Sequence, residues 1–410
     1  MRKFKFIVFF LSVSLSTVFA QQTSFPSELG IGQTWNRSLT KRIGQVIALE
    51  ARHQGVAELP LPPLKYGDSP YLVAELGIEM SKGLYTYSPV TGMDRTVEGD
   101  AEARAAFERI THESGILTPK TFEPLPALTS DELANEKKEH AAVALQALRE
   151  SIVLLKNENN VLPIARSKRI SVSSPYYNKK ERGKALTEAR GYDVLTVIWD
   201  AEAAEHVEAR IWLKTLCALG KPVILVLSGN EPFAVDAMIS ESVSAVIAAW
   251  FPKSTGGELI GDVIRGIYAP GSRLTAAIYD TQGNVIYPMG HGLSYTTVTY
   301  SDLTLEPVDT DKGKNYIVRF NVTNTGKRTS DEVALLYLQK VSNSADAKSI
   351  RMEGFKRTNL KPGETKEIKF TIRPRNLEVV DQQMNRKIEP GEYKVTLSGQ
   401  IPSKTFTVTP

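Results

Sequence analysis

The sequence predicts an α/β protein in which an α/β sandwich is followed by a β-sandwich. Two observations predict this class. In the middle of the chain, short continuous apolar runs alternate with amphipathic stretches, which is typical of a parallel sheet with helices on both faces. Beyond about residue 297, apolar residues recur at every second position and turn residues separate the segments, which indicates short antiparallel strands.

Composition and charge narrow the classes of function. The 410 residues are 42% hydrophobic and 23% charged, as in an ordinary globular protein. The net charge of +4 predicts neither a nucleic-acid partner nor an anionic membrane surface. One cysteine, Cys217, excludes a disulfide framework, and the 5 histidines show no close ligand spacing. We therefore expect no metal site and no cofactor.

The start of the chain has the pattern of a secretory signal peptide. Basic residues come first, an apolar run follows, and small-residue spacing stands at Val18-x-Ala20. The apolar run is shorter than the ~20 residues of a membrane-spanning helix. We assign residues 1–20 to the signal peptide and expect a secreted or periplasmic protein without membrane contact after cleavage. An uncleaved anchor is the alternative.

The next block, Thr23 to Pro126, carries helical patterns separated by Gly and Pro. Apolar spacing predicts helices over residues 39–56, 71–84 and 100–112. Three prolines in residues 59–64 exclude a central strand there, because proline cannot donate to a sheet ladder.

The second block, from about residue 132 to 294, predicts the α/β sandwich. A long helix over residues 132–155 leads into it. Trp250 ends its last apolar run and is expected in the core. The predicted strands lie at 170–172, 194–199, 223–227 and 243–250, and the predicted helices at 180–189, 203–219, 232–238 and 257–268.

The third block predicts an immunoglobulin-like or fibronectin-type sandwich. Residues 316–322, 366–372 and 392–397 alternate in polarity, and Pro-Gly turns separate several of them.

Several motifs stand in a specific order along the second and third blocks. They are Arg-Glu-Ser-Ile-Val-Leu-Leu-Lys-Asn-Glu at 149–158, Gly-Lys-Pro-Val-Ile-Leu-Val-Leu at 220–227, Trp-Phe-Pro at 250–252, Pro-Gly-Ser-Arg-Leu at 270–274 and Tyr-Pro-Met-Gly-His-Gly-Leu-Ser-Tyr-Thr-Thr at 287–297. In this order they resemble glycoside hydrolase family 3, whose members are exported β-glucosidases and related exo-acting enzymes. Thr23–Pro26 and Tyr66–Val73 resemble pieces of the family's catalytic (β/α)8 barrel.

The resemblance implies three units after the signal peptide. Residues 21–126 would be an incomplete barrel remnant, 127–294 the family's α/β sandwich, and 295–410 a fibronectin type III-like domain. A closed barrel needs about 250 residues and rarely fewer than about 200. The first unit is therefore far too short to close.

The resemblance also shows which catalytic elements this sequence lacks. The family's nucleophile is an aspartate in a Ser-Asp-(Trp/Tyr) turn, and this sequence has no such triplet. Ser130-Asp131-Glu132 comes nearest, but it has the pattern of a helix start. Gly92-Met93-Asp94 resembles the stretch after the nucleophile strand, which suggests an internal deletion.

For the acid/base group, the resemblance points to a glutamate shortly before an arginine, after the predicted strand 194–199. Glu205 and Glu208 are the candidates, with Arg210 as the neighbour. The alternative is structural: Glu202, Glu205 and Glu208 recur every three residues, as on the exposed face of a helix.

The resemblance therefore implies a retaining, β-glucosidase-like hydrolase of O-glycosyl bonds that acts on β-glycosides or oligosaccharides. Retaining glycosidases need two carboxyl groups about 5–5.5 Å apart. Since no nucleophile is found, we expect weak activity or none. One alternative is a non-catalytic exported protein that binds carbohydrate or protein. Another is an eroded gene product whose barrel helices expose apolar faces. The sequence predicts no oligomeric state.

Overall fold

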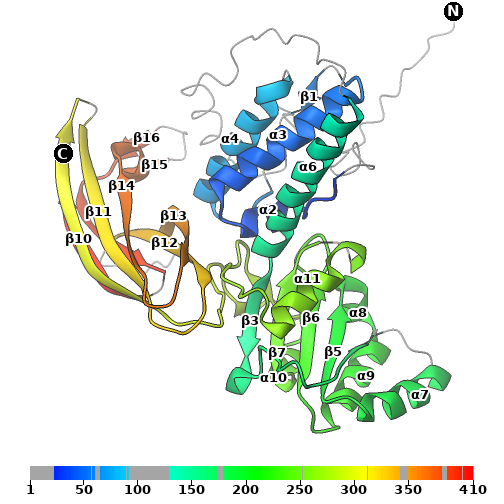
Figure 1. The fold of residues 1–410 in the computed structure, drawn as a ribbon. Coiled ribbons are helices and arrows are strands. Elements are labelled where there is room, and N and C mark those ends of the chain that lie inside the picture. Colours follow the sequence, from blue (N-terminus) through cyan, green and yellow to red (C-terminus); the bar gives the residue numbers. More distant parts are fainter. Residues whose placement is uncertain are drawn as a thin grey trace, which may run out of the picture.

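The computed structural model describes residues 23–56, 58–60, 65–88, 90–91, 129–173, 175, 179–251, 253–311, 313–341, 350–380, 386–398 and 400–409. Figure 1 shows three units in these residues: a group of helices, an α/β sandwich below it and a β-sandwich beside it. The predicted signal peptide and the predicted helix 100–112 lie outside the described residues.

The helical group contains α2 (Glu28–Gln33), α3 (Arg37–His53), α4 (Pro70–Tyr87) and α6 (Ser130–Glu150). Two of the three helices predicted in the first block are thereby confirmed. Each helix begins at a residue whose side chain accepts a hydrogen bond from the first turn. These residues are Ser27, Asn36, Ser69 and Thr129.

Thr129, rather than Ser130, starts α6. Its hydroxyl accepts from the backbone N–H of Glu132, and the Glu132 carboxylate accepts from the backbone N–H of Thr129. This reciprocal pair is a capping box. It also confirms that Ser130-Asp131-Glu132 belongs to a helix start and not to a nucleophile turn.

Helices α3 and α4 touch through their backbones. A Cβ atom on Gly83 would lie 2.1 Å from the carbonyl oxygen of Lys41, and one on Gly44 would lie 2.5 Å from that of Met80. The strands β1 (Leu59–Pro60) and β2 (Val90–Thr91) form a two-stranded parallel sheet. Within the described part of residues 23–126, these are the only paired strands, and they close no barrel.

The apolar faces of the described helices are buried. Trp35, Ile43 and Leu76 are each at most 1% exposed and belong to one core cluster with Val143 of α6 and Phe355 of the β-sandwich. Apart from Leu133 and Leu145 on α6, which are 38% and 40% exposed, the large apolar side chains of these described helices are therefore covered, contrary to what an eroded gene product predicts. The β-sandwich and α6 both contribute side chains to this cover.

The α/β sandwich is built on a five-stranded sheet in the order β3-β7-β6-β5-β4. Neighbouring strands are parallel, except that β3 runs antiparallel to β7. The strands are β3 (Val153–Asn157), β4 (Ile170–Ser173), β5 (Val194–Trp199), β6 (Val223–Ser228) and β7 (Ala245–Ala249). All four strands predicted for this block are present.

The long helix predicted over 132–155 is wrong at its end. Helix α6 stops at Glu150, and β3 begins at Val153 and pairs with β7. Ile152, Val153 and Leu154 are apolar at consecutive positions and fully buried. Such a run has no polar face for a half-exposed helix, and a strand covered on both faces accommodates it.

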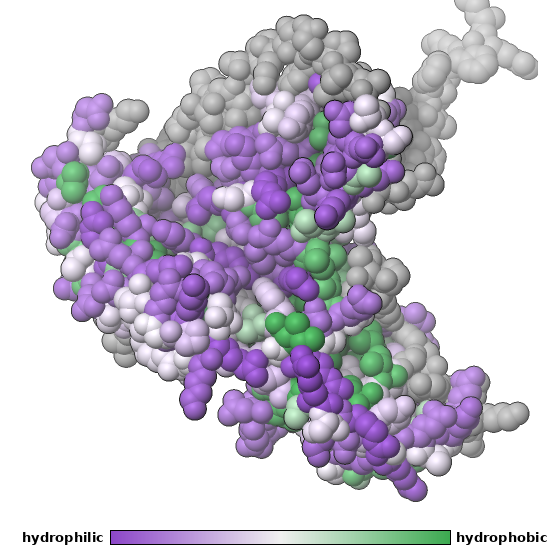
Figure 2. All heavy atoms as spheres, viewed as in Figure 1, coloured by the Kyte–Doolittle hydropathy of each residue, from purple (hydrophilic) through white to green (hydrophobic). Residues whose placement is uncertain are grey.

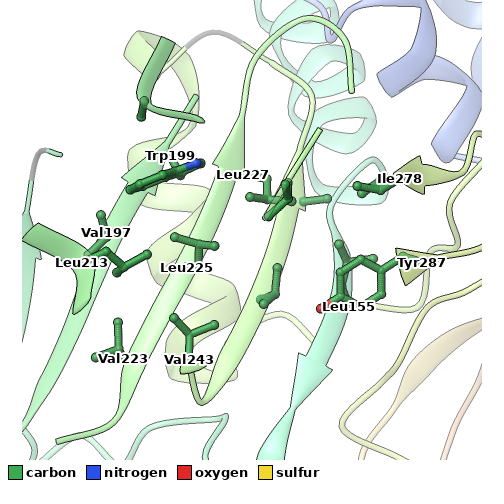
Figure 3. Close-up of a cluster of buried hydrophobic side chains, with 14 of the residues drawn as sticks. Leu155, Val197, Trp199, Leu213, Val223, Leu225, Leu227, Val243, Ile278 and Tyr287 are labelled. Carbon is green, nitrogen blue, oxygen red and sulfur yellow. The ribbon is translucent and has the colours of Figure 1, made fainter. Parts of the chain in front are cut away.

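Helices cover both faces of the sheet. On one face lie α7 (Lys179–Arg190), α8 (Ala201–Glu205) and α9 (Val207–Cys217), and on the other lies α11 (Lys253–Arg265). Figure 3 shows the first of these two cores, in which Trp199 and Leu213 pack against Leu225. Trp250 is fully buried in this core, as predicted.

Two helix predictions need correction. The helix predicted over 203–219 breaks at His206, whose backbone is extended (φ −80°, ψ 116°), so α8 and α9 are separate. The helix predicted over 232–238 is displaced: α10 spans Ala237–Ser242. Phe233 contacts the Trp250 ring, so the segment before α10 packs without being helical.

The C-terminal unit is a β-sandwich of two antiparallel sheets, in the orders β10-β11-β14 and β13-β12-β17-β18. The strands predicted at 316–322, 366–372 and 392–397 lie within β11, β14 and β17. The strand bounds are β10 (Val298–Thr310), β11 (Gly313–Asn324), β12 (Ser330–Lys340), β13 (Ile350–Leu360), β14 (Thr365–Ile372), β17 (Gly391–Leu397) and β18 (Gln400–Val408). The pairs β8 (Ile278–Tyr279) with β9 (Val285–Tyr287) and β15 (Glu378–Val380) with β16 (Arg386–Ile388) are short additions.

In the part of the chain that the structure describes, no helix has the length and apolarity needed to cross a bilayer.

The close contact of α3 and α4 predicts the effect of adding one methyl group. Gly83→Ala should lower the free energy of unfolding by about 1–3 kcal/mol, because the new Cβ collides with backbone that cannot rotate away. Gly183→Ala in α7 is the matched control, since nothing lies within 4 Å of its Cβ position. The control should be neutral or stabilising by up to ~1 kcal/mol. Urea denaturation measures both, and equal stability of the two variants would contradict the prediction.

Candidate functional site

The two acid/base candidates lie where the chain leaves the end of β5. The Asp200 side chain accepts a hydrogen bond from the Ala203 backbone N–H at 2.8 Å and so begins α8. Glu205 is the last residue of α8, and Glu208 lies in the first turn of α9. The structure thus brings the candidates to either side of the break at His206.

Both candidates are exposed. The Glu208 carboxylate contacts the guanidinium of Arg182 on α7, not that of Arg210, and its side chain is 67% exposed. Glu205 is also exposed. Neither residue lines either of the two cavities described below. Their assignment as acid/base groups stays a prediction, since a general acid acts only within hydrogen-bond reach of a bound glycosidic oxygen.

The carboxyl end of β7 is covered by the helical group. In open α/β sheets, ligands commonly bind outside the carboxyl ends of the strands. Here the Ser27 backbone N–H donates to the Trp250 carbonyl at 3.3 Å, and the Ser27 hydroxyl donates to the same oxygen at 3.2 Å. A Cβ atom on Gly30 would lie 2.7 Å from that oxygen. Helix α2 therefore occupies this part of the edge, and Trp250 offers no face for a sugar ring.

The guanidinium of Arg357 on β13 lies where the three units meet. Its Nη1 donates to the Thr34 carbonyl at 2.8 Å and to the Ser272 hydroxyl at 2.7 Å. Its Nε donates to Asp331 on β12 at 2.8 Å and lies 3.5 Å from the Glu150 carboxylate. The Arg357 side chain is only 6% exposed. One buried cation thus connects the helices, the α/β sandwich and the β-sandwich.

The charges in this network stabilise one another. Burial alone would lower the pKa of Arg357, but the neighbouring Tyr268, Asp331 and Glu150 raise it above its ordinary value. Burial likewise favours the neutral form of Asp331, yet Arg357 holds the pKa of Asp331 below its usual range. Burial raises the pKa of Tyr268 to about 12. The network is therefore an ionised pair beside a neutral phenol.

A polar cavity of about 350 Å³ lies beside this network. The Asn36 side chain at the start of α3 donates to Glu150 at 2.9 Å, and the Asn359 side chain donates to Asp331 at 2.8 Å. The cavity is lined by Trp35, Asn36, Arg37, Ser38, Glu150, Asp331, Lys356, Arg357, Thr358 and Asn359. We name it the junction cavity.

The two carboxylates of the junction cavity do not form a glycosidase pair. A retaining mechanism needs one carboxyl group held protonated as the acid and one free to attack. Arg357 keeps Asp331 ionised and contacts Glu150 from the same side. This arrangement can hold the units together and can hydrogen-bond a polar ligand.

Sequence reasoning did not single out this network. Glu150 lies in the motif at 149–158 and Ser272 in the motif at 270–274, so a signal existed for both residues. For Arg357 no such signal existed in the sequence, because a single polar residue in an alternating strand is normally exposed.

Among the described residues, no cluster of His, Cys, Asp or Glu could hold a metal ion. Cys217, at the end of α9, is half-buried and unpaired, and burial raises the pKa of its thiol.

Comparisons with known proteins agree with this architecture. Residues 182–295 match the glycosyl hydrolase family 3 C-terminal domain, and residues 332–400 match the fibronectin type III-like domain. A periplasmic β-glucosidase of Salmonella typhimurium is 32% identical over 215 residues, which are 45% of this chain and 28% of that protein. A β-xylosidase of Formosa agariphila is 25% identical over 349 residues, which are 63% of this chain and 48% of that protein. The chain thus spans less than half the length of these curated relatives.

Solved structures share the fold. A mutant β-glucosidase from Listeria innocua, in complex with laminaribiose, matches with a TM-score of 0.76 at 15% identity, over 95% of this chain and 86% of that one. A family 3 β-glucosidase from Bifidobacterium adolescentis matches with a TM-score of 0.72 at 18% identity, over 94% and 88%. The mixed α/β architecture with a fibronectin-like domain is therefore shared with these β-glucosidases, and the predicted resemblance to glycoside hydrolase family 3 is confirmed.

The burial of Arg357 predicts a large effect of its removal. Arg357→Met should lower the free energy of unfolding by about 3–5 kcal/mol, because it leaves Asp331 buried without its cation. The matched control is Arg319→Met on β11, whose pair with Glu367 is exposed and should contribute at most about 1 kcal/mol. Chemical denaturation measures both variants. Similar losses in both would show that Arg357 is no more important than a surface cation.

The lowered pKa of Asp331 predicts a change at acid pH. Its ionised form stabilises the fold above its unfolded-state pKa of about 3.9, and this contribution is lost as the pH falls through the lower folded-state pKa. The stability difference between the wild type and Asp331→Asn should therefore shrink from about pH 6 to about pH 3. Denaturation at each pH measures this difference. In an Arg357→Met background this pH dependence should disappear or reverse in sign, because burial then favours the neutral form of Asp331, and its persistence with the same sign would exclude Arg357 as the cause.

Proposed function

We propose that the protein is a hydrolase of the family 3 type, whose reaction is the retaining hydrolysis of O-glycosyl bonds in β-glycosides. We expect its turnover to be weak or absent. The proposal is supported by the family match and by relatives named β-glucosidase and β-xylosidase. One structural neighbour holds laminaribiose, a β-linked disaccharide, which supports a β-glycoside as the ligand class here.

One structural observation carries the expectation of weak turnover. The family's nucleophile lies on its barrel, and the described part of residues 23–126 pairs only two two-residue strands. A retaining mechanism with one carboxyl group lacks its covalent step. General acid catalysis alone supplies about 10²–10⁴-fold, whereas complete enzymes typically reach about 10⁶-fold or more. Glu205 and Glu208 remain the proposed acid/base groups.

The junction cavity favours a second candidate function, carbohydrate binding without turnover. Its lining includes amide, hydroxyl and charged groups, the groups that hydrogen-bond sugar hydroxyls, and its volume is about 350 Å³. This volume lies at the small end of ligand pockets, which are commonly about 300–1,000 Å³.

We also propose that the protein is exported and acts in the periplasm or outside the cell. The pattern of residues 1–20 and the periplasmic relative support this location. The N-terminus of the mature chain, determined by mass spectrometry on a periplasmic fraction, tests it: an N-terminus near Gln21 would fit export with cleavage, and retention of Met1 would contradict it.

Hydrolysis of aryl β-glucosides and aryl β-xylosides by the full-length mature chain tests the proposed activity. We expect rates far below those of complete family members. The Glu205→Gln, Glu208→Gln double variant should abolish any turnover that remains, because it removes both proposed proton donors. Glu188→Gln on α7 is the matched control, an exposed glutamate on a neighbouring helix. Turnover that survives in the double variant would reject the acid/base assignment.

Calorimetric titration with laminaribiose distinguishes the second function. Saturable binding without turnover, weakened in Asn359→Ala, would favour binding at the junction cavity. Absence of both binding and turnover would reject both proposals.

A further inference from the structure

An open apolar groove runs along the α/β sandwich, on the face of the sheet opposite to α9 and Glu208. It has a volume of about 540 Å³ and lies between α11 and the outer strands β4 and β5. Figure 2 shows hydrophobic residues exposed on this unit beside α11, on the side of β5. The groove is lined by Ile170, Val172, Ser173, Pro175, Thr196, Ile198, Ser228, Gly257, Ile260, Gly261, Ile264 and Arg265.

The groove is open because α11 covers only part of the sheet. Register pairs Val172 on β4 with Thr196 on β5, so both side chains point to the α11 face. Residues of β6 and β7 on that face are buried beneath α11, whereas Val172 is 70% exposed. Gly257 and Gly261, one helical turn apart on α11, have nothing within 4 Å of their Cβ positions. Parallel sheets are normally covered on both faces, and here the cover stops short of β4.

A buried polar atom in the groove lacks a partner. Thr196 is 1% exposed, and its Oγ1 makes no hydrogen bond. The neighbouring Ser228 hydroxyl differs, since it donates to the Phe251 carbonyl at 3.3 Å. Buried hydroxyls nearly always have a partner, and leaving one unpaired is costly. The Thr196 hydroxyl therefore has unused hydrogen-bonding capacity in the wall of the groove.

The charges around the groove limit the kind of molecule that fits. No acidic side chain is among the lining residues. The one cation, Arg265, donates to the carbonyls of Ala165 at 2.8 Å and Lys168 at 3.0 Å, so it already fixes the loop at one end. The remaining lining is mostly Ile, Val, Pro and Gly. These features favour a neutral molecule with an apolar body.

We propose that this groove binds a small neutral alcohol, whose apolar body lies between α11 and β4–β5 and whose hydroxyl pairs with Thr196. The volume of the groove lies within the range of small-molecule pockets, about 300–1,000 Å³. The site is separate from Glu205 and Glu208 and does not rest on glycoside hydrolysis.

Fluorescence titration of the full-length chain with 1-naphthol and with naphthalene tests the proposal, because the two probes differ only in the hydroxyl group. The wild type should bind 1-naphthol about 3–10-fold more tightly than naphthalene, as expected for one net hydrogen bond. Thr196→Val keeps the shape and removes the hydroxyl, so it should bind both probes about equally. Gly261→Leu fills the groove and should weaken binding of both probes by about tenfold or more.

Gly183→Leu on α7 is the matched control, an equally open helical glycine away from the groove, and it should bind both probes like the wild type. Equal affinity of the wild type for the two probes would overturn the role of Thr196. Binding that Gly261→Leu leaves unchanged, or no saturable binding at all, would overturn the site. A thermal unfolding curve for each variant shows that the fold is intact.

Discussion

The rest of the structure depends on one buried cation. The guanidinium of Arg357 reaches the helical group through Thr34 and Glu150, the α/β sandwich through Ser272 and the β-sandwich through Asp331. A buried charge is stable only when it is paired and hydrogen-bonded. Asp331 pairs with the guanidinium within the β-sandwich, and displacing either of the other two units would remove hydrogen-bond acceptors from this buried cation. A second buried pair, Arg273 with Glu332 at 2.6 Å, strengthens the same junction.

This junction explains how α3 and α4 remain folded where the described residues close no barrel. Helices α3 and α4 pack so closely that two glycines are needed at their contact. Their apolar faces are then covered by α6 and by strands β12 and β13. The hydrophobic effect requires that apolar surface leave water, but it does not prescribe which element covers it. In this chain the β-sandwich takes part in covering these helices.

The helices cover the two faces of the α/β sheet to different extents. On the α9 face, Trp199 and Trp212 fill the space between helix and sheet. On the α11 face, the helix stops short of β4, and a buried hydroxyl is left without a partner. The acid/base candidates therefore lie on the α9 face of the sheet, and the apolar groove lies on the opposite, α11 face.

The sequence by itself determined the local structure. Strands β4 to β7, helices α3 and α4 and the alternating strands of the β-sandwich follow from apolar periodicity, which reports the environment of each residue along its own element. The prediction from periodicity failed at residues 153–157, because periodicity does not distinguish a buried strand from a buried helix. It also failed at His206, where only the packing reveals the break between α8 and α9.

The tertiary structure alone decided the junction and the groove. Arg357 and Asp331 lie 26 residues apart, and Arg357 and Thr34 lie 323 apart, so no local pattern could pair them. The groove likewise depends on how far α11 reaches across the sheet. Both features arise from contacts between distant segments, and such contacts are fixed by three-dimensional packing rather than by the periodicity of any one segment.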